Sequence, residues 1–448
     1  MKTLAIQILE EGKVLQRKKV ELNMKTVAAP FLCESITNAE DLNILCQMGE
    51  YSNEEHDTLG YLGAVVYNIY NCENIISLFR SSMHQATLTG KRLGAEFRRL
   101  EEGKFKIIDP NTELFGISFK QPIYQYMKLK PPTFLLEHMK KLVSKGANCN
   151  SLHITLWNDL FPTDDRERAA AAQLINWFYR KEKLLGTDIF VPPVPSLNGK
   201  NCEELFEKAI FINKMASDII TDDVAAYFSV SADVFENRAV VEGIANYLSE
   251  GNAKVGLIKF TDPQNFVGLS FSEHAQNNLS LFLKILKLRN QTKETPMITG
   301  AFGGSGLGYC MLGAGFDFFT DTVNNYAQYP MPSKGQKKAR YRKCLNDKTL
   351  VPEKYEGIKS MFVDSGQNPM PYLPPEAGSY TREQFINNKI DPETWSRDCK
   401  LNGIGIWNEF TGELTDAIRT KTDTLFFDKI QRSRYAVLTP IIKDVRDF

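Results

Sequence analysis

The chain has 448 residues, of which 43% are hydrophobic and 24% are charged, so it can bury one large core with an added subdomain. Lysine plus arginine equals aspartate plus glutamate at 54 each, so the overall charge excludes a strongly basic or acidic protein and leaves any partner to local patches. No apolar run approaches the length of a membrane span and no signal pattern opens the chain, which predicts a cytoplasmic protein without a membrane partner.

The first 120 residues predict a hairpin, two strand–helix pairs and an insertion. Apolar runs on either side of a Glu-Glu-Gly-Lys turn predict a hairpin over residues 2–22. Strand-like and helix-like segments then alternate at residues 27–32, 38–47, 63–67 and 73–83. Three further runs are separated by turn-forming residues, and we interpret residues 94–119 as an inserted antiparallel unit with strands at 95–100, 105–108 and 114–119.

From residue 133 the alternation resumes. Helical spacing predicts helices over residues 133–145, 165–182, 202–215, 238–249 and 274–288. Short apolar runs predict strands over residues 152–156, 189–191, 225–230, 255–260 and 266–271. These runs contain few charges, as expected for parallel strands covered on both faces. About eight such strands with intervening helices predict an α/β fold of the (β/α)8, TIM-barrel type, with an open doubly wound sheet as the alternative.

The segment from Pro296 to Val323 gives the clearest functional signal. A short apolar run breaks into a loop with four glycines, a small-residue helix follows, and a second apolar run ends at Thr320-Asp321. This order predicts two neighbouring parallel strands. Ligands bind at the carboxyl ends of such strands, so we expect Asp321 and the glycine loop to border a site. Gly303 and Gly304 could expose backbone N–H groups to a phosphate or a base, or could serve only close strand–helix packing.

The amino-acid composition of the chain changes after residue 330. Residues 334–343 hold six cations and no acid, several prolines follow, and polar helices are expected over 380–435. We therefore divide the chain into a TIM-like barrel over 1–330 and a C-terminal basic, helical appendage over 331–448. The cationic run suits contact with nucleic-acid phosphates, with a solvated surface loop as the alternative. Its candidate contacts are Lys337, Lys338, Arg340, Arg342 and Lys343.

The eight cysteines are scattered and none forms a CxxC pair. Structural zinc needs four soft ligands, usually from closely spaced pairs, so we expect reduced, mostly buried thiols, no metal site and no cofactor. Asn158 and Asp159 follow the strand predicted at 152–156 and could read a purine edge by hydrogen bonds, or could be ordinary turn residues.

The order of segments resembles the tRNA-guanine transglycosylase superfamily, which includes relatives that insert 7-deazaguanine bases into DNA. The resemblance covers residues 20–330 and rests on four segments. Gly63–Asn68 is similar to an early strand of the family that ends in asparagine, and Phe97–Ile108 is similar to the hairpin that follows it. Val267–Glu273 is similar to the strand that lies behind the bound base. Ile298–Val323 is similar to the last two strands of the family, whose final aspartate is the nucleophile.

The resemblance implies exchange or recognition of a guanine or 7-deazaguanine base in nucleic acid. Asp321 would be the nucleophile, with Asp317 of the same segment as a second candidate catalytic carboxylate. Gly268 and Leu269 would lie behind the base, and Glu273 would hold a loop or an exocyclic amine. Asp321 could instead cap a turn, and Glu273 could be the N-terminal carboxylate of the next helix.

The chain departs from the family pattern at three places. The Asp-Ser-Gly-Gly-Phe-Gln motif is missing from residues 88–97, Thr320 stands where the nucleophile is expected, and Pro192-Pro193 replaces a Gln-Gly pair. Two alternatives therefore stay open: a catalytically lapsed barrel that acts as a nucleic-acid-binding or assembly subunit, and a small-molecule barrel enzyme whose glycine loop binds phosphate. The sequence does not distinguish DNA from RNA, identify the base or set the oligomeric state.

Overall fold

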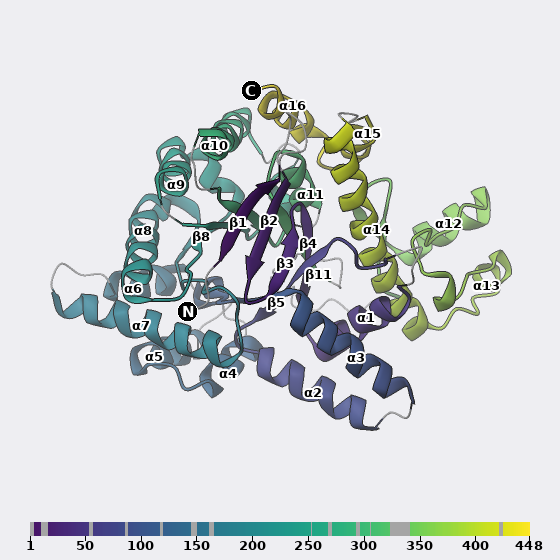
Figure 1. Ribbon diagram of the computed structural model, residues 1–448, viewed down its shortest axis with the longest axis horizontal. Helices are drawn as coiled ribbons and strands as arrows, with labels where there is room; N and C mark the ends of the chain where they lie inside the picture. Colours follow the sequence, from purple (N-terminus) through teal and green to yellow (C-terminus); the bar gives the residue numbers. More distant parts are fainter. Residues whose placement is uncertain are drawn as a thin grey trace.

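A computed structural model gives the fold of most of the chain. Figure 1 shows a central sheet surrounded by helices, a three-stranded sheet beside it, and a smaller lobe beyond the long helix α14. The described residues are 4–9, 17–52, 57–85, 88–116, 120–144, 150–160, 165–251, 253–267, 271–292, 296–304, 306–322, 341–420 and 424–448.

Eight parallel strands form the curled central sheet. They are β4 (Phe31–Ile36), β5 (Leu62–Asn68), β6 (Phe105–Asp109), β7 (Ser196–Leu197), β8 (Ala226–Val230), β9 (Val255–Phe260), β10 (Ile298–Phe302) and β11 (Phe318–Thr322). Their spatial order is β6-β5-β4-β11-β10-β9-β8-β7, so strands that follow each other in the chain are paired except for β6 and β7, and β11, the last, pairs with β4, the first. The predicted α/β class and the parallel pairing of the two strands around the glycine loop are confirmed.

The two edges of this sheet, β6 and β7, are consecutive in the chain. Ile189, just before β7, forms a single parallel bridge with Ile107 of β6, and Phe190 bridges to Val224, just before β8. The Asp188 amide also donates to the Lys106 carbonyl at 2.8 Å. The run predicted as a strand at 189–191 therefore forms isolated bridges, one to β6 and one to the residues just before β8.

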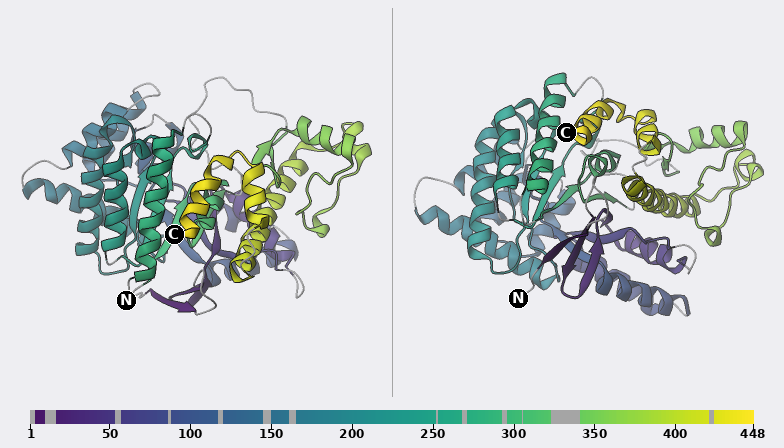
Figure 2. Two further views of the ribbon diagram at one scale, coloured as in Figure 1. Left: turned by 90° about the horizontal axis from the view of Figure 1, so that it is seen from above. Right: turned by 45° about the horizontal axis from the view of Figure 1, so that its top comes forward.

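Helices cover the outside of the curled sheet (Figures 1 and 2). Those that follow strands are α1 (Ala39–Glu50), α2 (Cys72–Gln85), α3 (Leu88–Gly103), α8 (Cys202–Ile219), α9 (Arg238–Glu250), α10 (Glu273–Thr292) and α11 (Gly306–Gly313). Between β6 and β7 the chain adds the short 3-10 helix η1 (Thr112–Gly116) and four helices, α4 (Lys120–Lys128), α5 (Thr133–Ser144), α6 (Asn150–Asp159) and α7 (Asp165–Leu184).

The predicted antiparallel insertion over 94–119 is wrong. Residues 95–100 belong to helix α3, in which Leu93, Phe97 and Leu100 are buried at helical spacing. Residues 105–108 belong to β6, which is parallel to β5 in the central sheet. The third expected strand begins in the 3-10 helix η1, and residues 117–119 lie outside the described ranges.

Two other predicted strands also differ from the structure. Residues 152–156 lie in α6, where His153, Leu156 and Trp157 are buried at the i, i+3, i+4 spacing of one helix face, and Leu160 just after the helix continues this spacing. Within the predicted strand 266–271, the described residues form bends rather than a strand. Phe266 and Phe271 contribute instead to a cluster of aromatic rings around Phe235, with ring centroids 5.2–6.3 Å apart.

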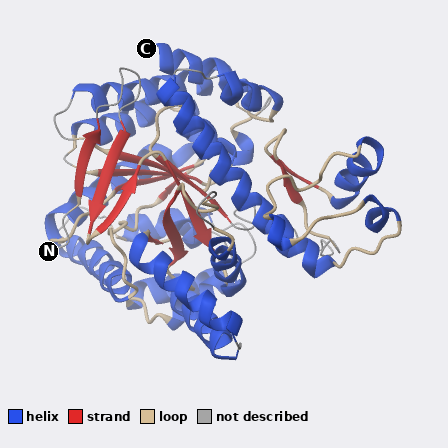
Figure 3. Cartoon of the chain, turned by 45° about the vertical axis from the view of Figure 1, so that its right-hand side comes forward, coloured by secondary structure: helices blue, strands red, loops and turns tan. Residues whose placement is uncertain are grey.

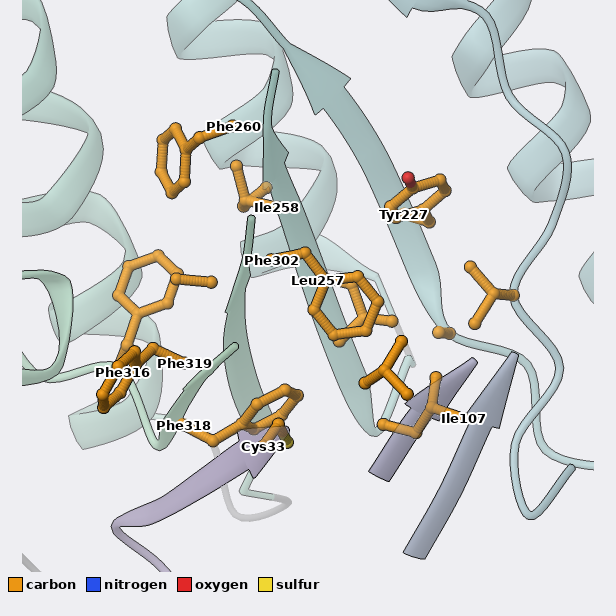
Figure 4. Packing of buried hydrophobic residues seen from close by; sticks show 14 of the residues in the cluster. Cys33, Ile107, Tyr227, Leu257, Ile258, Phe260, Phe302, Phe316, Phe318 and Phe319 are labelled. Carbon is orange, nitrogen blue, oxygen red and sulfur yellow. The ribbon is translucent and has the colours of Figure 1, made fainter. Parts of the chain in front are cut away.

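Side chains alternate across the strands between an interior and an outer face. Inside the curled sheet, Phe318 stacks on Phe31 at 4.8 Å between ring centroids and lies 6.1 Å from Phe302. Figure 4 shows Tyr227, Leu257 and Ile107 gathered with Phe302 on one side of the strands. Phe319 takes the opposite face and packs against Tyr309 of α11 and Trp407 of α14.

A three-stranded antiparallel sheet lies at the amino ends of the central strands. It comprises β1 (Ala5–Leu9), β2 (Arg17–Leu22) and β3 (Lys25–Ala28), so the predicted hairpin is confirmed apart from its turn, which lies outside the described residues. Lys18 donates to the Met297 carbonyl at 2.6 Å and to Asp317 at 2.8 Å, and Lys25 pairs with Asp188 at 2.7 Å. These ion pairs, one buried and one partly buried, fix the small sheet to the central one.

The C-terminal segment has two parts. Strands β12 (Cys344–Asn346) and β13 (Val351–Glu353), helices α12 (Tyr355–Ser365) and α13 (Arg382–Ile386), and the first turns of α14 (Pro392–Thr420) enclose a separate small core that includes Phe385 and Trp395. Figure 3 shows this lobe beside the main body. The rest of α14, with α15 (Thr424–Arg432) and α16 (Thr439–Asp447), joins the main core through Trp407, Phe426 and Ile442.

The seven cysteines in the described ranges are buried and free, as predicted. Within the same ranges no group of His, Cys, Asp or Glu side chains is arranged to hold a metal ion. None of the helices that the structure describes is both long and apolar enough to cross a bilayer.

Candidate active site

Polar side chains form a layer at the carboxyl ends of five strands. Asp109 is the last residue of β6 and lies opposite Asn68 of β5. Lys259 of β9 lies opposite Ser229 of β8, which in turn lies opposite Ser196 of β7. The Ser229 and Ser196 hydroxyls are 3.2 Å apart. The apolar interior of the sheet therefore gives way to charged and hydroxyl groups at the end where parallel α/β folds bind ligands.

One buried lysine joins two carboxylates in this layer. The Lys259 ammonium lies 2.5 Å from the Asp109 Oδ2 and 2.8 Å from the Glu113 Oε1, and all three residues are at most 5% exposed. Asn111 donates from its side chain to both carboxylates, at 3.0 Å and 3.3 Å. The cluster has one cation and two acids, so it carries one excess negative charge unless a proton or a cationic group neutralises it.

The local sequence after β6 builds this geometry. Asn111 has a φ of +50°, a left-handed conformation that asparagine adopts more readily than most residues. Its amide donates to the Asp109 carboxylate at 2.9 Å, which closes a tight turn. The turn places Glu113 in the first turn of η1, facing back toward Asp109.

Burial and mutual charge shift the pKa values of Asp109 and Lys259. Burial raises the pKa of Asp109, and the Lys259 ammonium opposes this rise. Burial alone would lower the pKa of Lys259, but the two carboxylates more than compensate and the net pKa of Lys259 is raised. Lys259 is therefore a cation at neutral pH, and the pKa of Asp109 lies above its usual value.

Aromatic and imidazole groups with free polar atoms surround the cluster. Tyr126 of α4 is fully buried, and its hydroxyl has no hydrogen-bond partner. Burial raises the pKa of this hydroxyl, and the nearby carboxylates of Glu113 and Asp109 raise it further. The second oxygen of Glu113, Oε2, is also buried without a partner. His153 contacts the Ser196 carbonyl through Nε2 at 3.3 Å, its Nδ1 has no partner, and burial lowers its pKa to about 4. Such unsatisfied buried atoms are costly, which makes them candidate ligand contacts.

Asp321, the predicted nucleophile, lies on the outer face of the sheet. Side chains alternate between the two faces along β11, so Asp321 points away from the interior side chains of Phe318 and Thr320. Asp321 lies opposite Glu34 of β4 and is 1% exposed. Its carboxylate accepts a hydrogen bond from the Trp407 indole of α14. Helix α14 therefore covers Asp321, which is kept away from the interior and from the Asp109 cluster.

The other predicted catalytic and base-reading residues are also distant from this cluster. Asp317 precedes β11 at the opposite end of the sheet, where it accepts hydrogen bonds from Thr299 and Lys18. Asn158 and Asp159 end helix α6 rather than a strand, and both are exposed. Asn158 accepts a hydrogen bond from Lys208.

The glycine loop has a structural explanation. Gly303 has a φ of +72°, and its amide donates to the Thr320 hydroxyl at 2.6 Å. A Cβ on Gly304 would lie 2.6 Å from the Gly308 amide nitrogen, so close packing of the first turn of α11 requires glycine there. Glu273 lies exposed in the first turn of α10, and Gly268 and Leu269 lie outside the described residues.

The predicted phosphate contacts fall mostly outside the described residues. Lys337, Lys338 and Arg340 belong to the segment 323–340, which the structure does not describe. Lys343 is exposed, and the Arg342 carbonyl accepts a hydrogen bond from the Trp395 indole at 2.8 Å. These two residues lie beside the small C-terminal core.

The residues of the cluster had a recognisable signal in the sequence. Lys259 is the one charge in the apolar run 255–260, and Asp109 ends the apolar run 105–108. A charge in a strand buried on both faces needs a partner, so such positions indicate an ion pair or a site. The partner could not be identified, because Lys259 and Asp109 are separated by 150 positions.

The sequence matches no known family model, and no curated protein shows significant similarity to it.

Proposed function

We propose that this protein is a transglycosylase-like enzyme that exchanges a guanine-type base in nucleic acid, with Asp109 and Glu113 as its catalytic carboxylates. We also propose that its eight strands form a (β/α)8 barrel, closed between β6 and β7 by the bridges at Ile189 and Phe190. The observation that carries the functional proposal is the buried cluster of Asp109, Glu113 and Lys259 at the carboxyl end of the sheet.

The chemistry of glycosyl transfer fits two close carboxylates. The reaction breaks the bond between the anomeric carbon and the old base while a carboxylate oxygen bonds to that carbon, and the new base then reverses the step. Retaining enzymes hold the two carboxyl groups roughly 5–5.5 Å apart. Here one oxygen of each carboxyl group contacts the same ammonium, so the two groups lie close together.

The environment of each carboxyl group favours one role. Glu113 has a free buried oxygen, Oε2, and we assign it as the nucleophile. The raised pKa of Asp109 suits a general acid that gives a proton to the departing base and a general base that takes one from the incoming base. The negative charge of the Glu113 carboxylate would stabilise the cationic, oxocarbenium-like transition state.

The experiment is base exchange on DNA and RNA that contain labelled guanine, with free guanine or 7-deazaguanine as the incoming base. We expect Glu113→Gln and Asp109→Asn each to lower the rate by about 10²–10⁴-fold. Asp321→Asn should retain activity, because that carboxylate lies under α14. Loss of exchange in Asp321→Asn with full activity in Glu113→Gln would reject the assignment.

A second candidate function is a catalytically lapsed, nucleic-acid-binding subunit. It is favoured by Lys259, whose ammonium already neutralises part of the charge that a nucleophile needs. In that case the wild-type protein binds nucleic acid, exchanges no base on either DNA or RNA, and Asp109→Asn changes nothing but stability.

A further inference from the structure

Helix α4 connects the candidate active site with the surface. Its inner face carries Tyr126, which is fully buried and packs on Phe115 at 5.5 Å between ring centroids. Its outer face carries Lys120, Tyr124 and Lys128, which are exposed at the i, i+4, i+8 spacing of one helical stripe. Tyr124 is 48% exposed, which is high for a tyrosine on a folded surface.

This stripe continues onto helix α7. Lys130 follows the end of α4 and is exposed, and the Trp177 indole of α7 donates to its carbonyl at 3.1 Å. Arg180 lies one turn beyond Trp177 and is exposed. Lys181 and Leu129 line one small cavity, which confirms that the end of α4 and the second half of α7 lie together. Figure 1 shows α4, α5 and α7 grouped on one side of the sheet.

Positive charge is concentrated on this side of the molecule. Residues 120–144 contain five lysines and one acid, Glu137, although the whole chain has equal numbers of cations and acids. Lys140 and Lys141 of α5 add to the exposed charge. We define the basic track as Lys120, Tyr124, Lys128, Lys130, Trp177 and Arg180.

The composition of the basic track matches one class of ligand. Lysine and arginine side chains neutralise backbone phosphates, and exposed aromatic rings stack with unpaired bases. A lipid surface would use the cations but would not need Tyr124 between Lys120 and Lys128. A double helix offers no unpaired base to stack on Tyr124.

We propose that the basic track binds a single-stranded stretch of nucleic acid and that α4 positions it next to the Asp109 cluster. This inference deepens the proposed function and rests on it, because it supplies the polymer whose base the cluster would exchange. It assigns a binding surface that includes none of the residues of the cationic run at 334–343.

The test is the equilibrium binding of fluorescent single-stranded DNA, single-stranded RNA and a blunt duplex to the full-length protein at several salt concentrations. We expect the triple variant Lys120→Gln, Lys128→Gln, Lys130→Gln to bind single strands at least about tenfold more weakly and to reduce the slope of log affinity against log salt by about 2. Tyr124→Ala should weaken single-strand binding by about tenfold and leave the salt slope unchanged. A matched control removes three exposed lysines elsewhere, Lys214→Gln, Lys354→Gln and Lys389→Gln, and should bind as the wild type does.

Several outcomes would overturn the inference. Equal affinity of the two triple variants, tighter binding of the duplex than of single strands, or binding of anionic phospholipid vesicles that exceeds nucleic-acid binding would each do so. Thermal melts of every variant exclude unfolding as the cause of a loss. The wild-type protein separates this inference from the proposed function: if it exchanges no base while its binding still depends on the track, the chemistry alone is rejected, and base exchange without track dependence rejects the track alone.

Discussion

Glu34 is a carboxyl group buried without compensation beneath α14. It is 0% exposed, and neither of its carboxylate oxygens has a hydrogen-bond partner. Burial, together with the nearby carboxylates of Asp321 and Asp41, raises the pKa of Glu34 well above its usual value. Two carboxyl groups opposite each other on neighbouring strands cannot both ionise cheaply, so Glu34 keeps its proton in the folded protein.

The proton on Glu34 makes the stability of the folded protein depend on pH. The unfolded chain releases it above a pKa of about 4.3, so folding must take up a proton and stability falls as the pH rises from there toward the folded pKa. Glu34→Gln removes this dependence. We expect it to unfold with a higher free energy than the wild type at about pH 8, by about 1.4 kcal/mol per unit of pKa shift, and to show no such gain below about pH 4.5.

Chemical denaturation of both proteins across this pH range measures the difference. Glu73→Gln is the matched control, because Glu73 is exposed on α2. An equal gain at low and high pH would contradict the linkage argument and indicate a change in packing.

The sequence could not show which strand-end carboxylate faces the interior of the sheet. Asp321 ends an apolar run, as a catalytic carboxylate at a strand end does, yet the alternation along β11 places it on the outer face. A strand buried on both faces shows no hydrophobic alternation in its sequence, so the interior and outer residues could not be distinguished. Asp109 ends its own strand in the same way but faces inward to Lys259.

At the scale of elements, long amphipathic helices and the apolar strands between them were predicted well. The helix α9 and the strand β9 lie almost where the pattern places them. The errors at α3 and α6 have one cause: each contains a short segment in which the spacing of the apolar residues also fits a strand. Burial at every third or fourth position, visible over a longer window, identifies both as helices.

The ion pair that attaches the N-terminal sheet to the central sheet should contribute to stability. Lys18 of β2 is buried, and its ammonium pairs with Asp317 and the Met297 carbonyl. Lys18→Met leaves Asp317 buried without its counter-ion, so we expect the free energy of unfolding to fall by about 3–5 kcal/mol. The double variant Lys18→Met, Asp317→Asn removes both charges and should lose less than Lys18→Met alone.

Urea denaturation of the two single variants and the double variant completes this cycle. Additive losses would show that the ammonium and the carboxylate do not interact. The outcome also bears on function, because a purely structural Asp317 predicts that folded Asp317→Asn keeps any base-exchange activity.

At the scale of the whole molecule, the chain has two hydrophobic cores of unequal size. The large one fills the central sheet and its helices, and the small one lies between β12, α12, α13 and the start of α14. Phe385 is the centre of the small core, with the rings of Tyr355, Phe362, Tyr380 and Trp395 all 5.2–5.8 Å away. Helix α14 belongs to both cores, with Trp395 in the small one and Trp407 in the large one.

Two cores joined through helix α14 and strand β12 should unfold with separate stabilities. Phe385→Ala removes a fully buried ring, which costs about 3–5 kcal/mol in a well-packed core. We expect hydrogen exchange to accelerate between residues 341 and 399, while strands β8 to β10 keep wild-type protection. Phe228→Ala in the buried strand β8 is the matched control and should accelerate exchange in the central sheet instead. Uniform acceleration in Phe385→Ala would mean that α14 couples the two cores into one cooperative unit, because its second half would then transmit the loss to Trp407 and the central sheet.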